Sequence, residues 1–138
     1  MAVTRSIELK TEIPGPRSRE ILRRKARAVA DPLVVYIPVV AQEARGALLT
    51  DVDGNTFVDF TGGVGVMNVG YSHPRVLEAM REQLDRFVHT DFTVIAYEPY
   101  VELAERLGAL APISGPVKAG FFNSGAEAVE NAVKWARL

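Results

Sequence analysis

The residues best placed for chemistry lie in a short turn at Ser124-Gly125, between a predicted strand over 117–122 and a predicted helix from Ala126. Ser124 and Glu127 have the spacing of a capping box, which defines where the helix begins. The first amides of the helix, from Gly125 to Glu127, then have no intrahelical acceptor, and the helix dipole favours an anion beside them. Because Gly125 has no Cβ, these amides stay open to a group of phosphate size. The turn predicts either a phosphate site or a structural turn without a ligand.

A glycine-rich segment, 61–70, directly follows a predicted strand and must be compared with the dinucleotide-binding fingerprint G-x-G-x-x-G. Gly63 and Gly65 supply two glycines, but residue 68 is Asn where the third is required. The acidic residue that should follow, Asp85, falls in a predicted helix and not at the end of a strand. The fingerprint is therefore excluded, and the segment predicts close backbone packing or a ligand-facing loop. A phosphate-binding G-x-x-x-x-G-K-[ST] motif does not occur in the sequence either.

Oxygen-bearing side chains around residues 53–54 raise the question of a metal site. An EF-hand loop needs Gly at its sixth position, but counting from Asp51 that position is Thr56. Turn chemistry is therefore favoured over metal binding. The two histidines, His73 and His89, have no ligand spacing and are interpreted as capping or packing residues. The oxygen-bearing residues are Asp51, Asp53, Asn55 and Asp59.

Composition indicates a globular protein. The 138 residues are 48% apolar and 24% charged, with a net charge of −1, which gives no support for binding nucleic acid. A chain of this length predicts one domain that buries roughly two thirds of its unfolded surface. The longest apolar stretch, 33–41, is too short to span a membrane. The absence of cysteine excludes disulfides and thiol catalysis, and a cytoplasmic location is expected.

Charge is unevenly distributed along the chain. Residues 1–27 carry eight Lys and Arg against three Asp and Glu, a net +5, and the remainder carries eight against fourteen, a net −6. The basic residues of 17–27 predict a short charged helix. Such a helix either binds phosphates or is a solvated face lying on the acidic remainder of its own protein.

Apolar periodicity predicts the other elements. Asp53-Gly54 has the composition of a tight hairpin turn. Two helices have apolar residues at steps of three and four, and one face of each is expected to be buried. The predicted elements are strands over 33–37, 47–52 and 56–60 and helices over 74–88 and 98–111.

Three blocks of sequence, in order, resemble the class III, fold-type I aminotransferases, and above all the 4-aminobutyrate aminotransferases. The resemblance runs from about Arg17 to the last residue. It implies an α/β fold in which residues 1–70 form an N-terminal arm and hairpin segment. Residues 71–138 would then be the incomplete start of the large domain that binds pyridoxal 5′-phosphate. The blocks are Phe60–Gly70 (FTGGVGVMNVG) followed by His73-Pro74, then His89–Tyr100, then Asn123–Lys134 (NSGAEAVENAVK).

The resemblance also implies the site residues. Backbone amides at Ser124, Gly125 and Ala126 would bind the phosphate of pyridoxal 5′-phosphate, and Val64 would line the substrate pocket. Ala126 replaces a Ser common in relatives, so an amide contact is retained and a hydroxyl contact is lost. The whole enzyme would be a homodimer that moves an amino group from an ω-amino acid to a 2-oxo acid such as 2-oxoglutarate.

The resemblance further implies what the chain does not contain. The family's Schiff-base lysine, the aspartate that pairs with the pyridine nitrogen and the arginine that holds a substrate carboxylate lie beyond the matched region. None of the four lysines, Lys10, Lys25, Lys118 and Lys134, matches the Schiff-base motif. The helical pattern runs to Leu138 without a terminating Gly or Pro, which predicts a truncation. The isolated chain is therefore expected to have no catalytic residue and no activity.

Two alternatives remain open from the sequence. One is a non-catalytic interaction or regulatory module derived from an aminotransferase, which would bind a partner through its apolar faces. The other is a small α/β nucleotide-binding protein that uses the same turn. For a truncated aminotransferase, the strand over 117–122 should be central in the complete sheet. It would lack most neighbours here, so the isolated chain is expected to associate.

Overall fold

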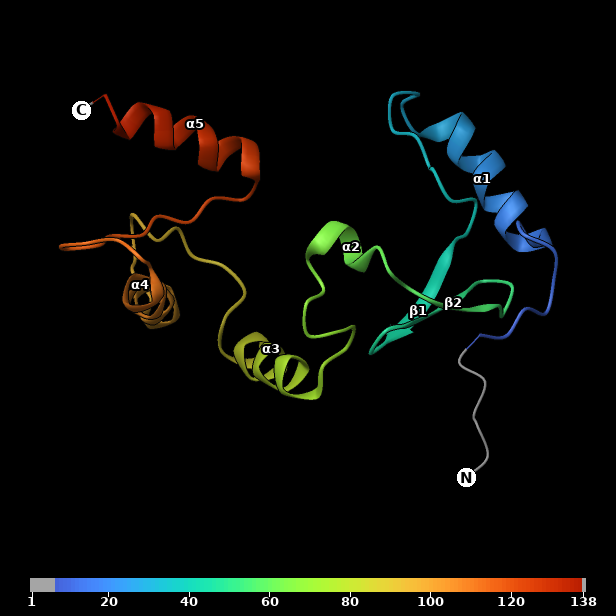
Figure 1. Ribbon diagram of the computed structural model, residues 1–138, viewed down its shortest axis with the longest axis horizontal. Coiled ribbons are helices and arrows are strands. Elements are labelled where there is room, and N and C mark those ends of the chain that lie inside the picture. Colours follow the sequence, from blue (N-terminus) through green and yellow to red (C-terminus); the bar gives the residue numbers. More distant parts are fainter. Residues whose placement is uncertain (1–6, 138) are drawn as a thin grey trace. The chain divides into compact units, whose positions relative to one another are not determined.

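The computed structural model describes residues 7–137, which form helices and one small antiparallel sheet (Figure 1). The chain divides into two compact units, Met1–Arg86 and Phe87–Leu138, which are described separately. The predicted α/β class is confirmed, whereas the expected domain boundary at residue 70 stays a prediction. The first unit contains α1 (Pro16–Ala28), β1 (Ala41–Arg45), β2 (Leu48–Asp51), β3 (Thr56–Val58), α2 (Gly62–Gly65) and α3 (Pro74–Arg86). The second contains α4 (Glu98–Leu110) and α5 (Gly125–Trp135).

The sheet of the first unit has the strand order β1-β2-β3, with both pairs antiparallel. The predicted hairpin is confirmed, because β2 and β3 pair in register with Leu49 opposite Phe57. An isolated bridge between Glu8 and Thr56 ties the N-terminal segment to the outer side of β3. The sheet therefore fixes both the hairpin and the segment that leads to α1.

A buried polar network holds the β2–β3 turn. The Asn55 side chain accepts hydrogen bonds from the amides of Lys10 and Thr11 at 2.7 and 2.9 Å. Its amide group donates to the Asp51 carboxylate at 2.8 Å, and the Asn55 backbone amide also donates to that carboxylate. Asp51 and Asn55 are 1% and 0% exposed. Asp51 and Asn55, two of the four residues considered for a metal, thus hold the turn, as the sequence predicted.

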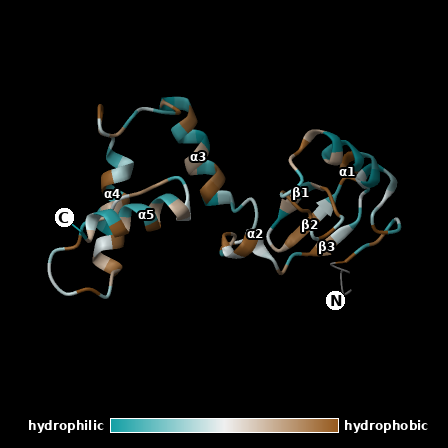
Figure 2. Cartoon of the chain, turned by 90° about the horizontal axis from the view of Figure 1, so that it is seen from above, coloured by the Kyte–Doolittle hydropathy of each residue, from teal (hydrophilic) through white to brown (hydrophobic). Residues whose placement is uncertain are grey.

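No apolar side chain is buried anywhere in residues 7–137. The expectation of one domain with a large buried core is therefore wrong. The expectation that the two amphipathic helices bury one face is also wrong, since Met80 and Leu84 of α3 are 56% and 59% exposed and Val101 of α4 is 44% exposed. Figure 2 shows apolar residues, in brown, along both helices. The reason is that, in this part of the chain, only the three strands pack extensively against one another.

Two predicted strands do not form in the described residues. Residues 33–37 instead make local turns, in which Leu33 donates to the Ala30 carbonyl and Val34 to the Pro32 carbonyl. Residues 117–122 have no strand partner. A strand needs a neighbour for its amides and carbonyls, and apolar β-branched composition alone does not supply one.

The second unit is organised around a cluster of aromatic rings. Phe92 stacks on Tyr100 with ring centroids 4.0 Å apart, and Tyr100 contacts Phe121 edge-on at 4.7 Å. Tyr97 packs edge-on against Phe92 and Tyr100. The cluster joins the start of α4 to the segment 117–122, which leads into the turn before α5.

Candidate functional site

The turn before α5 has the capping geometry that the sequence predicts. Ser124 is the N-cap residue, with extended backbone angles of φ −148° and ψ 158°. Its hydroxyl oxygen accepts the Glu127 amide at 3.2 Å. The Glu127 carboxylate accepts the Asn123 amide at 2.9 Å, one residue earlier than in a standard capping box. The two side chains together determine where α5 begins.

Two helix amides are left for a ligand at this turn. The Glu127 amide is used by Ser124, which corrects the expectation that three first-turn amides would be free. The amides of Gly125 and Ala126 have no intrahelical acceptor because of their position in the first turn. A Cβ added at Gly125 would meet nothing within 4 Å, so the turn is open at this residue. Two amide donors, the helix dipole and an open turn suit a phosphate group.

The segment before the turn is held by residues that the sequence reasoning did not identify. The Tyr100 hydroxyl accepts the Phe121 amide at 3.0 Å, which replaces a missing strand partner. Phe122 lies against Trp135 of α5, with ring centroids 5.7 Å apart. A Cβ at Gly120 would overlap the Trp135 ring, so glycine is needed there for close packing. The only sequence signal for this arrangement is the abundance of aromatic residues between Phe87 and Tyr100.

The glycine-rich segment forms a single left-handed turn, labelled α2. Its four residues all have positive φ, with values of 53° at Gly62, 62° at Gly63, 59° at Val64 and 83° at Gly65. Val64 is 96% exposed. The structure therefore confirms that this segment is not a dinucleotide fingerprint, which would have opened a regular helix. Val64 belongs to the first unit, and the turn at Ser124, Gly125 and Ala126 belongs to the second.

A carboxylate and a phenol lie at the base of the glycine-rich segment. Asp59 Oδ1 accepts the amide and the hydroxyl of Thr61 at 2.7 and 2.6 Å, and Oδ2 accepts the Tyr71 hydroxyl at 2.6 Å. Hydrogen bonds from the hydroxyls of Thr61 and Tyr71 and from the Thr61 amide lower the pKa of Asp59 to about 2. The same bond to a negative carboxylate raises the pKa of Tyr71.

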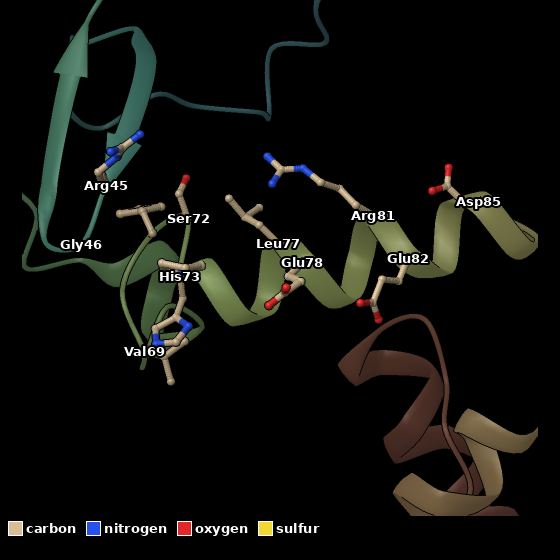
Figure 3. Close-up of a pocket in the computed structure, with 12 residues that line it drawn as sticks. Arg45, Gly46, Val69, Ser72, His73, Leu77, Glu78, Arg81, Glu82 and Asp85 are labelled. Carbon is tan, nitrogen blue, oxygen red and sulfur yellow. The ribbon is translucent and has the colours of Figure 1, made fainter.

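A groove of about 770 Å³ runs between the β1–β2 turn and α3 (Figure 3). Arg45 and Arg81 line it together with the carboxylates of Glu78, Glu82 and Asp85. Charges of both signs along an exposed helix are typical of a solvated face. His73 also lines the groove, and its backbone carbonyl accepts the amides of Val76 and Leu77 at the start of α3.

Comparison with known proteins identifies the class. The model of the family described as "Aminotransferase class-III" matches residues 29–138, so the chain belongs to this family. The family depends on pyridoxal 5′-phosphate and acts on amino and keto acids. The chain is 48% identical over 136 residues to a 4-aminobutyrate aminotransferase of Mycobacterium tuberculosis, covering 99% of this chain and 30% of that protein. A 5-aminovalerate aminotransferase of Pseudomonas aeruginosa is 45% identical over 120 residues, covering 87% of this chain and 28% of the relative.

Solved structures agree with the sequence relatives. An acetylornithine aminotransferase from Elizabethkingia anophelis superposes with a TM-score of 0.77 at 31% identity, covering 87% of this chain and 30% of that one. An omega-transaminase from Sphaerobacter thermophilus gives a TM-score of 0.77 at 30% identity, covering 90% of this chain and 28% of that one. The fold-type I assignment is therefore confirmed, and the chain spans about 30% of the length of the proteins it matches. Among the described residues, none of the helices has the length and apolar character needed to cross a membrane.

Proposed function

We propose that the chain is the N-terminal part of an aminotransferase that moves an amino group from an ω-amino acid, such as 4-aminobutyrate, to a 2-oxo acid such as 2-oxoglutarate. The names of the relatives at 48% and 45% identity support this substrate class. Within that enzyme, the chain would supply the turn that holds the cofactor phosphate. The observation that carries this role is the open space before Gly125 at the Ser124-capped start of α5.

Each residue of the turn has a defined part in this proposal. The amides of Gly125 and Ala126 would donate to phosphate oxygens, and Ser124 would keep those amides in place by capping the helix. Ala126 carries no hydroxyl, so it would contribute through its backbone alone. Pyridoxal 5′-phosphate, when bound, supplies an electron sink for the reaction. The exposed, apolar side chain of Val64 would contact the methylene groups of the amino donor.

The chain by itself would not transaminate. Covalent attachment of the cofactor requires a lysine with a fixed position and a lowered pKa, and none of the four lysines matches the family motif. Lys134 lies on α5 in an ion pair with Glu130 at 2.8 Å. The whole enzyme would bring in the missing lysine, act as a homodimer and work in the cytoplasm.

Substitution at Gly125 tests the phosphate turn in the enzyme that contains this chain. Gly125→Asp places a negative charge beside the phosphate, whereas Gly125→Asn adds a side chain of nearly the same size without the charge. We expect the Asp variant to bind pyridoxal 5′-phosphate at least about fivefold more weakly than the Asn variant, because like charges about 4 Å apart repel by about 1 kcal/mol even in water. Equal affinities in the two variants would contradict the assignment.

Two further tests separate this proposal from the alternatives. Reading the adjoining coding sequence shows whether an in-frame continuation carries the lysine motif, and a genuine stop would favour the interaction module. The isolated chain can also be mixed with pyridoxal 5′-phosphate, reduced with borohydride and mapped. We expect sparse labelling over several lysines. A single stoichiometric adduct together with amino transfer would contradict the proposal, and preferential binding of ATP or NAD would favour the nucleotide-binding alternative.

A further inference from the structure

The glycine-rich segment is a loop whose two ends are attached to the same turn of the sheet. At one end, the Asp59 amide donates to the Ala47 carbonyl at 2.8 Å. At the other end, Tyr71 exchanges two backbone hydrogen bonds with Gly46, at 2.9 and 2.8 Å. Since Gly46 and Ala47 are adjacent in the β1–β2 turn, the sheet brings Asp59 and Tyr71 together. Residues 60–70 therefore form a closed loop on a rigid base.

The side chains of the two end residues complete this closure. The Tyr71 hydroxyl donates to Asp59 Oδ2 at 2.6 Å. The other carboxylate oxygen, Oδ1, accepts from Thr61 at 2.7 and 2.6 Å and from the Gly62 amide at 3.3 Å. One carboxylate thus joins the end of the loop at Tyr71 to the first residues of the left-handed turn.

The left-handed turn at residues 62–65 needs hydrogen bonds that hold it in place. Val64 is a β-branched residue with φ 59° and ψ 48°, a left-handed conformation that costs an L-residue free energy. A conformation of this kind persists only when its surroundings determine it. Inside the loop, the Gly62 carbonyl accepts the amides of Val66 and Met67 at 2.9 and 2.8 Å. The Gly62 amide itself donates to Asp59, so the carboxylate anchors the residue whose carbonyl closes the left-handed turn.

We propose that Asp59 and Tyr71 are positioning residues that fix Val64 where it meets the amino donor. This proposal rests on the proposed function, in which Val64 contacts the methylene chain of the donor. Neither Asp59 nor Tyr71 would contact the substrate itself. The hydroxyl of Tyr71 donates a hydrogen bond to the Asp59 carboxylate. The carboxylate in turn accepts hydrogen bonds from Thr61 and Gly62, which begin the turn that contains Val64. The pair would therefore determine how closely the pocket fits donors of different length.

Loss of the hydrogen bond between Tyr71 and Asp59 should affect the position of Val64. Tyr71→Phe removes one hydroxyl and keeps the ring and the backbone bonds to Gly46. The Asp59 carboxylate would then keep its bonds to Thr61 and Gly62 but lose its tie to the other end of the loop, and Val64 would sample more than one position. Contacts with the donor would weaken, whereas the phosphate turn at Ser124-Gly125 would be unaffected. We expect KM for the donor to rise while kcat and the content of pyridoxal 5′-phosphate change little.

The first experiment measures the loop directly in the whole protein that contains the chain, independently of its activity. Amide hydrogen exchange at Thr61 and Val66 is compared in the wild type, in Tyr71→Phe and in Tyr36→Phe. Tyr36 is a matched control, because it lies in the same unit and is 91% exposed. Exchange should be about two- to tenfold faster in Tyr71→Phe, the range expected for the loss of one hydrogen bond, and unchanged in Tyr36→Phe. Equal exchange in the two variants would overturn the role of the Asp59–Tyr71 bond.

The second experiment measures function in the aminotransferase that contains the chain. KM for 4-aminobutyrate and for 5-aminovalerate should rise by about threefold or more in Tyr71→Phe, with a changed ratio between the two donors. Asp59→Asn should show the same pattern, and Tyr36→Phe should match the wild type. An active Tyr71→Phe enzyme with unchanged KM values would overturn the positioning role. If the wild-type enzyme does not transaminate, the proposed function fails, the positioning role fails with it, and the exchange experiment still decides whether the bond holds the loop.

Discussion

Asp53 caps a helix that begins far from it in the sequence, since its carboxylate oxygen Oδ1 accepts the backbone amide of Arg17 at 2.8 Å. The second oxygen accepts the Ser18 amide at 2.9 Å. The residue at the N-cap position of α1 is Gly15, which has no side chain to do this. Glycine is required there because a Cβ would overlap the Asp53 carboxylate. The β2–β3 turn therefore supplies the cap that α1 lacks.

Removal of this carboxylate should loosen α1. In Asp53→Ala, the amides of Arg17 and Ser18 lose their acceptor, so the first turn of the helix should fray. We expect reduced helical chemical shifts over residues 16–20 by NMR, with β2 and β3 unchanged. Asp31→Ala, which removes a carboxylate outside α1, serves as the control. An unaltered first turn in Asp53→Ala would contradict the capping role.

Asn55 should be the most sensitive position of the hairpin. Asn55→Ala leaves the part-buried amides of Lys10 and Thr11 without their acceptor, and the loss of an ordinary hydrogen bond costs about 0.5–1.5 kcal/mol. We expect the free energy of local opening at these two amides, measured by hydrogen exchange, to fall by about 1 kcal/mol. Gln42→Ala, at an exposed position of β1, should leave the exchange of both amides unchanged.

Gly70 should tolerate a side chain less well than Gly65. Both have positive φ, of 81° and 83°, so alanine at either position carries a conformational cost of about 1–2 kcal/mol. A Cβ at Gly70 would also lie 3.0 Å from the Gly46 backbone, whereas a Cβ at Gly65 would meet nothing within 4 Å. We expect Gly70→Ala to break the pairing of Tyr71 with Gly46, seen as faster exchange of the Tyr71 amide. Equal exchange in Gly70→Ala and Gly65→Ala would show that the close approach has no effect.

The glycine-rich loop should be released at acid pH. The hydrogen bonds of Asp59 lower its pKa from 3.8 to about 2, so its ionised form stabilises the folded loop. This stabilisation is present above the unfolded pKa and is lost as the pH falls from about 4 through about 2. The amide shift of Thr61 should therefore titrate in that range and lose its titration in Asp59→Asn. Asp91→Asn removes a similar carboxylate from the other unit and should leave the Thr61 titration in place.

The raised pKa of Tyr71 gives a pH dependence of stability opposite to that of Asp59. Its protonated form donates to Asp59, so the stabilisation is present below the ordinary tyrosine pKa of 10.0 and is lost as the pH rises through the raised value. Ultraviolet titration of the phenol at 295 nm should show one tyrosine ionising later in the wild type than in Asp59→Asn. Identical curves would contradict the hydrogen bond.

The sequence alone determined the elements that depend on neighbouring residues. Ser124 and Glu127 predicted the start of α5, and Asp53-Gly54 predicted the hairpin turn. The ranges of α3 and α4 also agree with the apolar periodicity. Caps, turns and helices are governed by interactions over a few residues, so a local pattern is sufficient to find them. The family could likewise be identified from blocks of local sequence.

Tertiary structure decided everything that depends on residues distant in the chain. The segments 33–37 and 117–122 have strand composition but form no ladder among the described residues, because a strand exists only with a partner. The apolar faces of the helices stay exposed for the same reason, since periodicity shows which face is apolar and not what covers it. The bond between Asp59 and Tyr71 arises because the sheet joins both ends of the loop at one turn. No local pattern carries that information, since the two residues are brought together by the turn that joins β1 and β2.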